Sequence, residues 1–258
     1  MLTSLQNPFV KQIRKLQAAK ERKEQNLFLL EGTHLLESAC TVDYPLVSVC
    51  CTEQWQANHQ LLWESLLLRA ERLEMVSPEV LKAMATTVNP DGIIATAKRP
   101  NSHNKLPYTG LLLALETVQD PGNLGTIIRT CAAAGAAGLW LSSNSVDLDH
   151  PKVLRASAGQ WFSLPMAVSD NLNATCLECQ KAGMQIVATA STAKLTYWEL
   201  DLQRPTLILL GNEGAGLSPQ LLGIADKQVS IPLKAGVESV NVAIAAALLL
   251  YEAQRQQR

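Results

Sequence analysis

The sequence predicts an α/β protein whose larger part is a parallel sheet with helices on both faces, preceded by a smaller α/β domain. Short apolar runs alternate with runs of helical periodicity along most of the chain. Residues 111–115 are continuously apolar, which is typical of a strand buried on both faces. Aromatic residues make up only 5% of a chain that is 47% hydrophobic, which favours an α/β protein over a β sandwich.

The first hundred residues predict a basic helix followed by a small α/β domain. Val10, Ile13 and Leu16 recur at helical spacing behind Asn7-Pro8, a common helix start, and the basic character runs on to Glu24. This pattern is typical of a basic amphipathic helix. The elements predicted next are strands at 27–30, 46–51, 71–76 and 92–97, with helices at 31–39, at 60–70 and after Ser77-Pro78.

A polar segment with two prolines, residues 99–109, predicts a linker. The predicted domains are therefore residues 1–98 and 110–258, which agrees with a chain of 258 residues being long for one domain. The elements predicted after the linker are strands at 111–117, 139–142, 164–168, 186–190, 207–210 and 229–233, and helices at 124–134, 151–158, 174–182 and 242–252.

Composition excludes several classes. A net charge of -1 and a pI near 6.4 weigh against non-specific nucleic-acid binding, although Lys and Arg concentrate in the first 25 residues. No apolar run approaches the roughly 20 residues that span a bilayer, and no apolar leader opens the chain, so we expect a cytoplasmic protein without membrane contact. Cys176 and Cys179 form a lone C-x-x-C, so we expect no metal.

Two glycine-bearing loops follow two strands near the C-terminus, at residues 211–218 and 234–241. Ligands of open α/β sheets bind beyond the carboxyl ends of strands, so these loops are the predicted ligand site. The signatures of P-loop, dinucleotide-binding, esterase and metallopeptidase sites are absent from the sequence. An oxidoreductase would also need an acidic residue after its first glycine loop, and none is found there.

Three motifs together resemble a known family. They are Asn123-x-Gly125-x-x-x-Arg129, the segment 210–217, and the segment 231–233 leading to Ser239-Val-Asn241 with a closing Glu252. In this order they resemble the SpoU/TrmH family of ribose 2'-O-methyltransferases in the SPOUT superfamily. Residues 28–39 also resemble the start of the L30e-like substrate-binding domain that many rRNA-modifying members carry.

The resemblance implies a C-terminal trefoil knot, a homodimer, and S-adenosylmethionine as the cofactor. It implies no metal, because the methyl donor is already electrophilic. The cofactor-binding residues it implies are Thr189, Gly211, Ile231, Leu233 and Val240. The catalytic residues it implies are Arg129, Asn123, Glu213, Ser239 and Asn241. Alternatives remain from the residues themselves: Asn123 could cap a helix, as could Ser239 and Asn241, and Arg129 could form a surface ion pair.

The family assigns activation of the ribose 2'-OH to the arginine that matches Arg129. Because a guanidinium with a pKa above about 12 stays charged, we expect Arg129 to bind phosphate and polarise the hydroxyl, with Glu213 orienting it. The residues expected to bind RNA are Lys11, Arg14, Lys15, Arg22 and Lys23. Structured large-subunit rRNA is the favoured substrate, while a tRNA substrate and a non-catalytic RNA-binding role remain alternatives.

Overall fold

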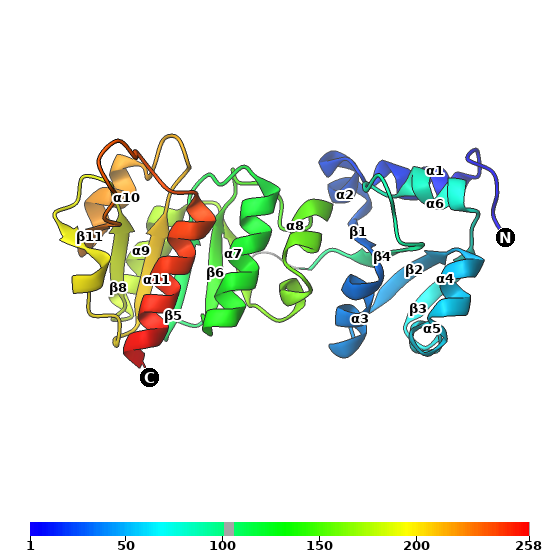
Figure 1. The fold of residues 1–258 in the computed structure, drawn as a ribbon, viewed down its shortest axis with the longest axis horizontal. Coiled ribbons are helices and arrows are strands. Elements are labelled where there is room, and N and C mark those ends of the chain that lie inside the picture. The colour runs from blue at the N-terminus through cyan, green and yellow to red at the C-terminus, as the bar shows by residue number, and fades with distance from the viewer. Residues whose placement is uncertain (101–105, 258) are drawn as a thin grey trace. The chain divides into compact units, whose positions relative to one another are not determined.

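The computed structural model describes residues 1–100 and 106–257 and divides the chain into two compact units (Figure 1). The N-terminal unit contains Met1–Pro100 together with Asp147–Phe162. The C-terminal unit contains Asn101–Val146 and Ser163–Arg258. The sequence-based boundary assigned 147–162 to the C-terminal domain, so the structure differs there. Of the predicted linker, residues 99–109, positions 101–105 lie outside the described residues.

The N-terminal unit is built on a mixed four-stranded sheet in the order β1-β4-β2-β3. Strand β4 is antiparallel to both β1 and β2, whereas β2 and β3 are parallel. The strands are β1 Leu27–Glu31, β2 Leu46–Cys51, β3 Ala70–Met75 and β4 Ile93–Lys98. The helices are α1 Pro8–Lys15, α2 Ala19–Gln25, α3 Thr33–Thr41, α4 Glu53–Asn58, α5 Gln60–Leu67, α6 Pro78–Met84 and α8 Pro151–Ala156, with a 3-10 turn η1 Gln160–Phe162.

Helix α1 begins as predicted. The Asn7 side chain accepts a hydrogen bond from the Phe9 amide, and Pro8 occupies the first turn. Val10 and Ile13 are buried in a cluster with Leu81 and other residues of α6. The predicted basic helix is interrupted after α1, however, and α2 starts anew at Ala19, so the basic region forms two short helices.

The segment 147–162 joins the N-terminal unit through aromatic packing. The Trp161 ring lies 5.3 Å from the Phe28 ring and 6.1 Å from the Tyr44 ring, centroid to centroid. Phe162 adds a fourth ring, 5.2 Å from Tyr44. At Gly159, whose φ is +80°, an added Cβ would lie 2.1 Å from the Ser38 Oγ, so only glycine lets the segment approach α3 this closely.

The C-terminal unit contains a seven-stranded sheet in the order β7-β6-β5-β10-β8-β11-β9, and every strand pair in it is parallel. The strands are β5 Leu111–Leu115, β6 Gly138–Ser142, β7 Met166–Ser169, β8 Gln185–Thr189, β9 Leu195–Thr196, β10 Thr206–Leu210 and β11 Lys227–Ser230. The predicted parallel sheet is confirmed. The trefoil knot stays a prediction.

Helices cover both faces of this sheet (Figure 1). Helices α7 and α11 lie together on one face, while α9 and α10 pack against each other on the other face. Their bounds are α7 Pro121–Ala134, α9 Leu172–Lys181, α10 Pro219–Ile224 and α11 Val242–Gln257, with a 3-10 turn η2 Tyr197–Glu199. Helix α10 was not predicted, although Ser218 and Pro219 repeat the start signal of Ser77 and Pro78.

Candidate active site

A cleft of about 520 Å³ lies beyond the carboxyl ends of β8 and β10, and we call it the C-terminal cleft. Three chain segments supply most of its lining: 189–192 after β8, 210–217 after β10, and 238–245 at the start of α11. The two predicted loops therefore meet at one cleft, through residues 211–217 and 238–240, and ligand binding there stays a prediction. The segment after β8 was foreseen only at Thr189, although the small side chains that follow it are suited to a close approach.

The loop after β10 folds back on itself and requires glycine at position 211. Asn212 and Gly216 exchange two backbone hydrogen bonds, of 3.1 and 2.8 Å, which brings Gly216 beside Gly211. A Cβ added at Gly211 would lie 2.2 Å from the carbonyl carbon of Gly216 and 2.3 Å from the amide nitrogen of Leu217. No side chain fits there, so the loop keeps its backbone groups at the cleft wall.

Asn212 holds this loop from within, and the sequence prediction missed it. Its Oδ1 accepts hydrogen bonds from the amides of Gly214 and Ala215, at 2.9 and 3.1 Å. Its Nδ2 donates to the carbonyl of Thr117, at 2.9 Å, which ties the loop to the end of β5. An asparagine between strand and glycines is a common turn former, and that signal could have identified it.

A chain of hydrogen bonds links three of the predicted catalytic residues, and we call it the amide relay. The Ala243 amide donates to Asn241 Oδ1 at 2.8 Å, and Asn241 Nδ2 donates to Asn123 Oδ1 at 3.0 Å. Asn123 Nδ2 then donates to Glu213 Oε1. Because a backbone donor stands at one end and a carboxylate acceptor at the other, both carboxamide orientations are fixed.

The structure corrects the expected helix start at Asn123. Helix α7 begins at Pro121, and its N-cap is Asp120, which accepts a 2.8 Å hydrogen bond from the Asn123 amide. Asn123 therefore lies within the first turn, where its side chain is free to join the relay. Asn241 accepts the Ala243 amide at the start of α11, as the capping alternative predicted, and it also donates to Asn123. Its catalytic role stays a prediction.

Arg129 lies on the exposed surface of α7, six residues after Asn123. The expected contact in which Glu213 orients Arg129 is not found in the described part of the chain, because Glu213 bonds to Asn123 instead. Within residues 1–100 and 106–257, Arg129 forms no ion pair, so the alternative of a surface ion pair is not supported either. Its guanidinium donors are left available to a substrate.

The predicted cofactor residues separate into two groups. Thr189, Gly211 and Val240 line the C-terminal cleft, as does the catalytic candidate Ser239. Ile231 and Leu233 do not line it; both follow the end of β11 at Ser230. Their role in cofactor binding stays a prediction.

Most of the predicted RNA-binding residues are exposed, but Arg22 is buried, so the prediction for this residue was wrong. Arg22 is only 1% exposed, and its guanidinium donates to Asp147 at 3.2 Å and to Asp149 at 3.3 Å. Its donors are thus occupied inside the N-terminal unit and cannot reach a phosphate. The exposed residues are Lys11, Arg14, Lys15 and Lys23. Lys23 also lies 3.5 Å from Asp147.

Cys176 and Cys179 are buried thiols, and burial raises the pKa of the first to about 12 and of the second to about 11. Both are therefore protonated at neutral pH and are poor nucleophiles. The described residues hold no cluster of three or more His, Cys, Asp or Glu that could bind a metal ion. Nor do they include a helix long and apolar enough to cross a membrane.

Comparisons with known proteins agree with this geometry. The family model "SpoU rRNA Methylase family" matches residues 110–251, and the model "MRM3-like substrate binding domain" matches residues 7–95. An uncharacterized tRNA/rRNA methyltransferase of Synechocystis is 46% identical, over 99% of this chain and 94% of its own. The 23S rRNA (guanosine(2553)-2'-O)-methyltransferase RlmP of Bacillus subtilis is 34% identical, over 97% of both chains.

Solved structures differ in how much of this chain they match. An AdoMet-bound rRNA methyltransferase from Sinorhizobium meliloti has a TM-score of 0.86 at 32% identity and covers 98% of this chain and 97% of its own. By contrast, the A. aeolicus TrmH/SpoU tRNA modifying enzyme has a TM-score of 0.51 at 29% identity and covers 61% of this chain and 78% of its own. The motifs, the parallel sheet and these matches agree, and the chain belongs to the SpoU rRNA Methylase family of methyltransferases.

Proposed function

We propose that this protein transfers a methyl group from S-adenosylmethionine to a ribose 2'-OH of large-subunit ribosomal RNA. The observation that carries the proposal is the amide relay, which brings Asn123, Asn241 and Glu213 from three distant segments to one place. The relay adjoins the C-terminal cleft through Glu213, which belongs to both. The relay therefore holds the proposed catalytic residues in a fixed arrangement beside the proposed cofactor cleft.

The C-terminal cleft fits S-adenosylmethionine. Its volume of about 520 Å³ lies within the usual range of ligand sites, about 300–1,000 Å³. Backbone carbonyls of residues 211–217 can bond the amino group of an adenine, whereas the Asn212, Gly214, Ala215 and Gly216 amides are already used within the loop. Val240, Val242 and Leu222 supply apolar side chains for the faces of the adenine. Bound there, S-adenosylmethionine would supply an electrophilic methyl group on a sulfonium, which requires no metal.

The protein's own groups must orient the ribose and accept a proton. Arg129 remains charged, so we assign it to a phosphate of the substrate and to polarising the hydroxyl. Glu213 uses Oε1 to accept the Asn123 hydrogen bond, whereas Oε2 has no hydrogen-bond partner among the described residues. That oxygen is the candidate acceptor for the 2'-OH proton, directly or through water. The relay keeps the carboxylate in place while it acts.

The N-terminal unit favours ribosomal RNA over tRNA. The Bacillus RlmP and the Sinorhizobium enzyme match this chain over almost its whole length. The A. aeolicus tRNA modifying enzyme matches only 61% of it. We therefore assign the N-terminal unit to rRNA binding, through Lys11, Arg14 and Lys15 on α1, and the C-terminal unit to methyl transfer. These relatives are bacterial, and bacteria make and modify ribosomal RNA in the cytoplasm, so we place the protein there.

We also propose that the protein acts as a homodimer whose contact includes α11. Ile244 on this helix is 52% exposed, Tyr251 is 49% exposed, and Trp198 in η2 is 59% exposed. Ile244 and Tyr251 line a shallow hollow of about 410 Å³ together with Tyr197, Ala247, Leu248 and Glu252. Contiguous exposed apolar groups of this kind mark association surfaces. Sedimentation of the full chain should give a dimer, and Ile244→Asp should shift it toward the monomer; a monomeric wild type at micromolar concentration would refute the dimer.

The function is tested by mapping ribose methylation in total RNA from cells with and without the gene. We expect the loss of one 2'-O-methyl group from large-subunit rRNA and its return when the gene is restored. Purified protein should transfer labelled methyl groups from S-adenosylmethionine to unmodified rRNA in the presence of EDTA. Identical methylation maps, with no transfer in vitro, would overturn the proposal. Loss of the methyl group from tRNA instead would select the tRNA alternative.

A further inference from the structure

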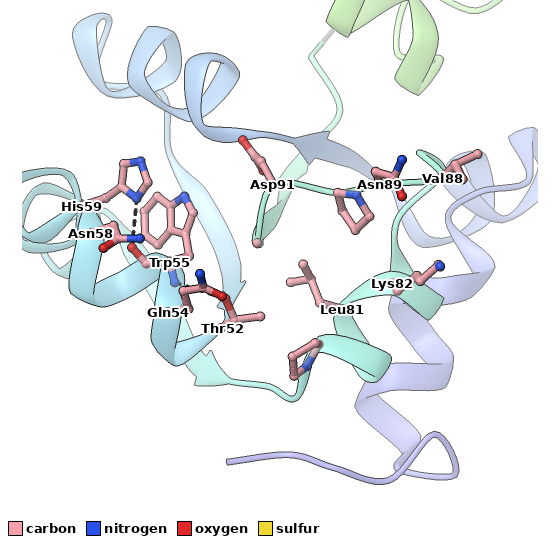
Figure 2. Close-up of a pocket in the computed structure, with 13 residues that line it drawn as sticks. Thr52, Gln54, Trp55, Asn58, His59, Leu81, Lys82, Val88, Asn89 and Asp91 are labelled. Carbon is pink, nitrogen blue, oxygen red and sulfur yellow. Dashed lines mark hydrogen bonds between the residues drawn. The ribbon is translucent and has the colours of Figure 1, made fainter.

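The N-terminal unit has a pocket of about 380 Å³ that the proposed chemistry does not use, and we call it the N-terminal pocket (Figure 2). Trp55 and Leu81 form its floor, from α4 and α6, and Gly92 closes it from the chain entering β4. Trp55 and Leu81 are each 2% exposed. The bottom of the pocket is therefore apolar and firmly packed.

Hydrogen bonds fix the wall of this pocket. Trp55 Nε1 donates to Thr33 Oγ1 at 2.8 Å, and the Thr33 amide and hydroxyl donate to Asp91 Oδ2 at 2.7 and 2.8 Å. The Thr52 amide donates to the Gly92 carbonyl at 2.9 Å. Gly92 has a φ of +110°, and an added Cβ would lie 2.9 Å from the Trp55 Cβ. The pocket is thus formed before any ligand arrives, which lowers the entropic cost of binding.

The rim, in contrast, presents polar groups with unused capacity. The side chains of Gln54, Asn58 and Asn89 line the pocket, and none has a hydrogen-bond partner within residues 1–100 and 106–257. Each carboxamide offers a donor beside an acceptor. His59 stacks on Trp55, with ring centroids 4.7 Å apart, and its Nδ1 bonds to the Trp55 carbonyl at 2.9 Å. A carbonyl only accepts, so Nδ1 carries the proton and, in the neutral ring, Nε2 is an acceptor.

Positive charge lies on the α6 side of this pocket. Lys82 on α6 lines it, is exposed, and forms no ion pair with the described residues. Helix α1, which carries Lys11, Arg14 and Lys15, packs alongside α6, as Figures 1 and 2 show. The basic surface of α1 therefore continues toward the pocket through Lys82. A backbone of phosphates that follows α1 would pass this rim.

These features suit one nucleobase of a single-stranded RNA segment. Sequence-specific proteins read unstacked RNA bases with side-chain hydrogen bonds to the base edge and apolar contacts to its faces. Carboxamides provide paired donors and acceptors for such edges. We propose that the N-terminal pocket binds one unpaired base of the RNA substrate, with Lys82 at a neighbouring phosphate. The inference rests on the proposed function only in taking RNA as the substrate.

The test uses the full-length protein and large-subunit rRNA transcribed in vitro, hence unmodified. A triple variant, Gln54→Ala with Asn58→Ala and Asn89→Ala, removes the rim carboxamides. We expect its RNA affinity to fall about tenfold or more with an unchanged salt slope, because base-edge contacts release no counterions. Lys82→Ala should instead lower the log-log salt slope by about 0.7 to 0.9. Gln60→Ala, an exposed carboxamide outside the lining, is the matched control and should bind like wild type.

A second measurement does not depend on any variant. Ultraviolet cross-linking of wild-type protein to the same RNA should attach nucleotides to peptides that contain residues 52–59 or 82–92. The proposal is overturned if no cross-link falls on these peptides, or if the triple variant binds RNA like wild type. Methyl transfer by the wild type in the same preparation separates the two ideas. If the wild type transfers methyl groups but the pocket substitutions do not change RNA binding, only this inference is refuted. If the wild type neither binds RNA nor transfers methyl groups, the proposed function is refuted as well.

Discussion

The two units hold distant segments together with different chemistry. In the N-terminal unit charged pairs join the segments: Arg22 is 1% exposed and Asp149 is 3% exposed, and the two meet across 127 positions of sequence. Arg155 likewise donates to Glu31, which is also buried. In the C-terminal unit the corresponding bonds are mostly neutral. Asn241 and Asn123 meet across 118 positions, and a glycine backbone contact closes the loop after β10.

The difference tells which charges are free for function. A buried ion pair is hard to change, because removal of one partner leaves the other desolvated and uncompensated. The charges of the N-terminal unit that are buried are therefore structural. The C-terminal unit keeps Arg129 and one oxygen of Glu213 without partners among the described residues, so its charges remain available to a substrate.

The largest effect is expected from Arg129→Ala, which tests whether the free charge of the C-terminal unit is chemical. Loss of a positioned cation that stabilises developing charge should lower methyl transfer by about 100-fold to 1,000-fold. The affinity for S-adenosylmethionine should stay within about twofold, because Arg129 does not line the C-terminal cleft. Single-turnover transfer and calorimetry measure the two quantities. An Arg129→Ala enzyme with nearly full activity would show that this charge is only a surface charge.

Arg22→Met tests whether the buried charge of the N-terminal unit stabilises the fold. Asp149 would lose its buried partner but keep Arg99, so we expect the free energy of unfolding to fall by about 1.5–3 kcal/mol, the range for hydrogen bonds to charged groups. Urea unfolding followed by tryptophan fluorescence measures it. Lys23→Met is the control: Lys23 pairs with Asp147 from an exposed position, and its removal should cost less than about 1 kcal/mol. Equal effects of the two substitutions would contradict the distinction between buried and exposed pairs.

Gly211→Ala tests the backbone contact of the C-terminal unit. The new Cβ would collide with the backbone at Gly216, so the loop must move and the affinity for S-adenosylmethionine should fall by about tenfold or more, which is about 1.4 kcal/mol per factor of ten. Gly214→Ala is a close control, because its Cβ would meet only Asn212 Oδ1, at 3.6 Å. Similar cofactor affinities for both variants would show that the loop tolerates a side chain at position 211.

Replacing the basic side chains of α1 tests whether the exposed charges of the N-terminal unit bind RNA, in contrast to its buried charges, which stabilise the fold. The variant Lys11→Gln with Arg14→Gln and Lys15→Gln should reduce the salt slope of RNA binding by about 0.7 to 0.9 for each phosphate that α1 no longer neutralises. Stability should hardly change, because these side chains are exposed. Deletion of residues 1–25 would be a poorer experiment, since it also removes Val10, Ile13 and Arg22 from the interior. An unchanged slope would show that α1 does not bind phosphates.

The smallest expected effect is a loss of stability at acid pH, caused by Glu252 in α11. The hydrogen bond from Arg255 lowers the pKa of Glu252 to about 2, and Gln256 contributes in the same direction. The folded pKa thus lies below the ordinary value of 4.5, so this stabilisation is present above about pH 4.5 and disappears as the pH falls toward 2. Glu252→Gln should flatten the acid limb of the stability curve slightly. Superimposable acid limbs would refute the contribution.

Local pattern sufficed wherever a short stretch determined its own structure. The cap at Asn7 with Pro8 and the turn at Asn212 were predictable, because these hydrogen bonds lie within a few residues. Strand β5 was predictable from its continuous apolar run, although its strand partners are distant. The start of α7 was placed three positions late, since Asp120 and Asn123 are both good caps and only the structure selects between them.

By itself the sequence determined the parallel sheet, the family motifs and the two loops that line the cleft at the strand ends. Only the tertiary structure decided that 147–162 belongs to the N-terminal unit, that Arg22 is buried, and that Asn123 bonds to Glu213 and Asn241. The physical reason is sequence distance. The periodicity of a helix or strand reports which face is buried, but not which partner 90 to 127 positions away supplies the countercharge or the hydrogen bond.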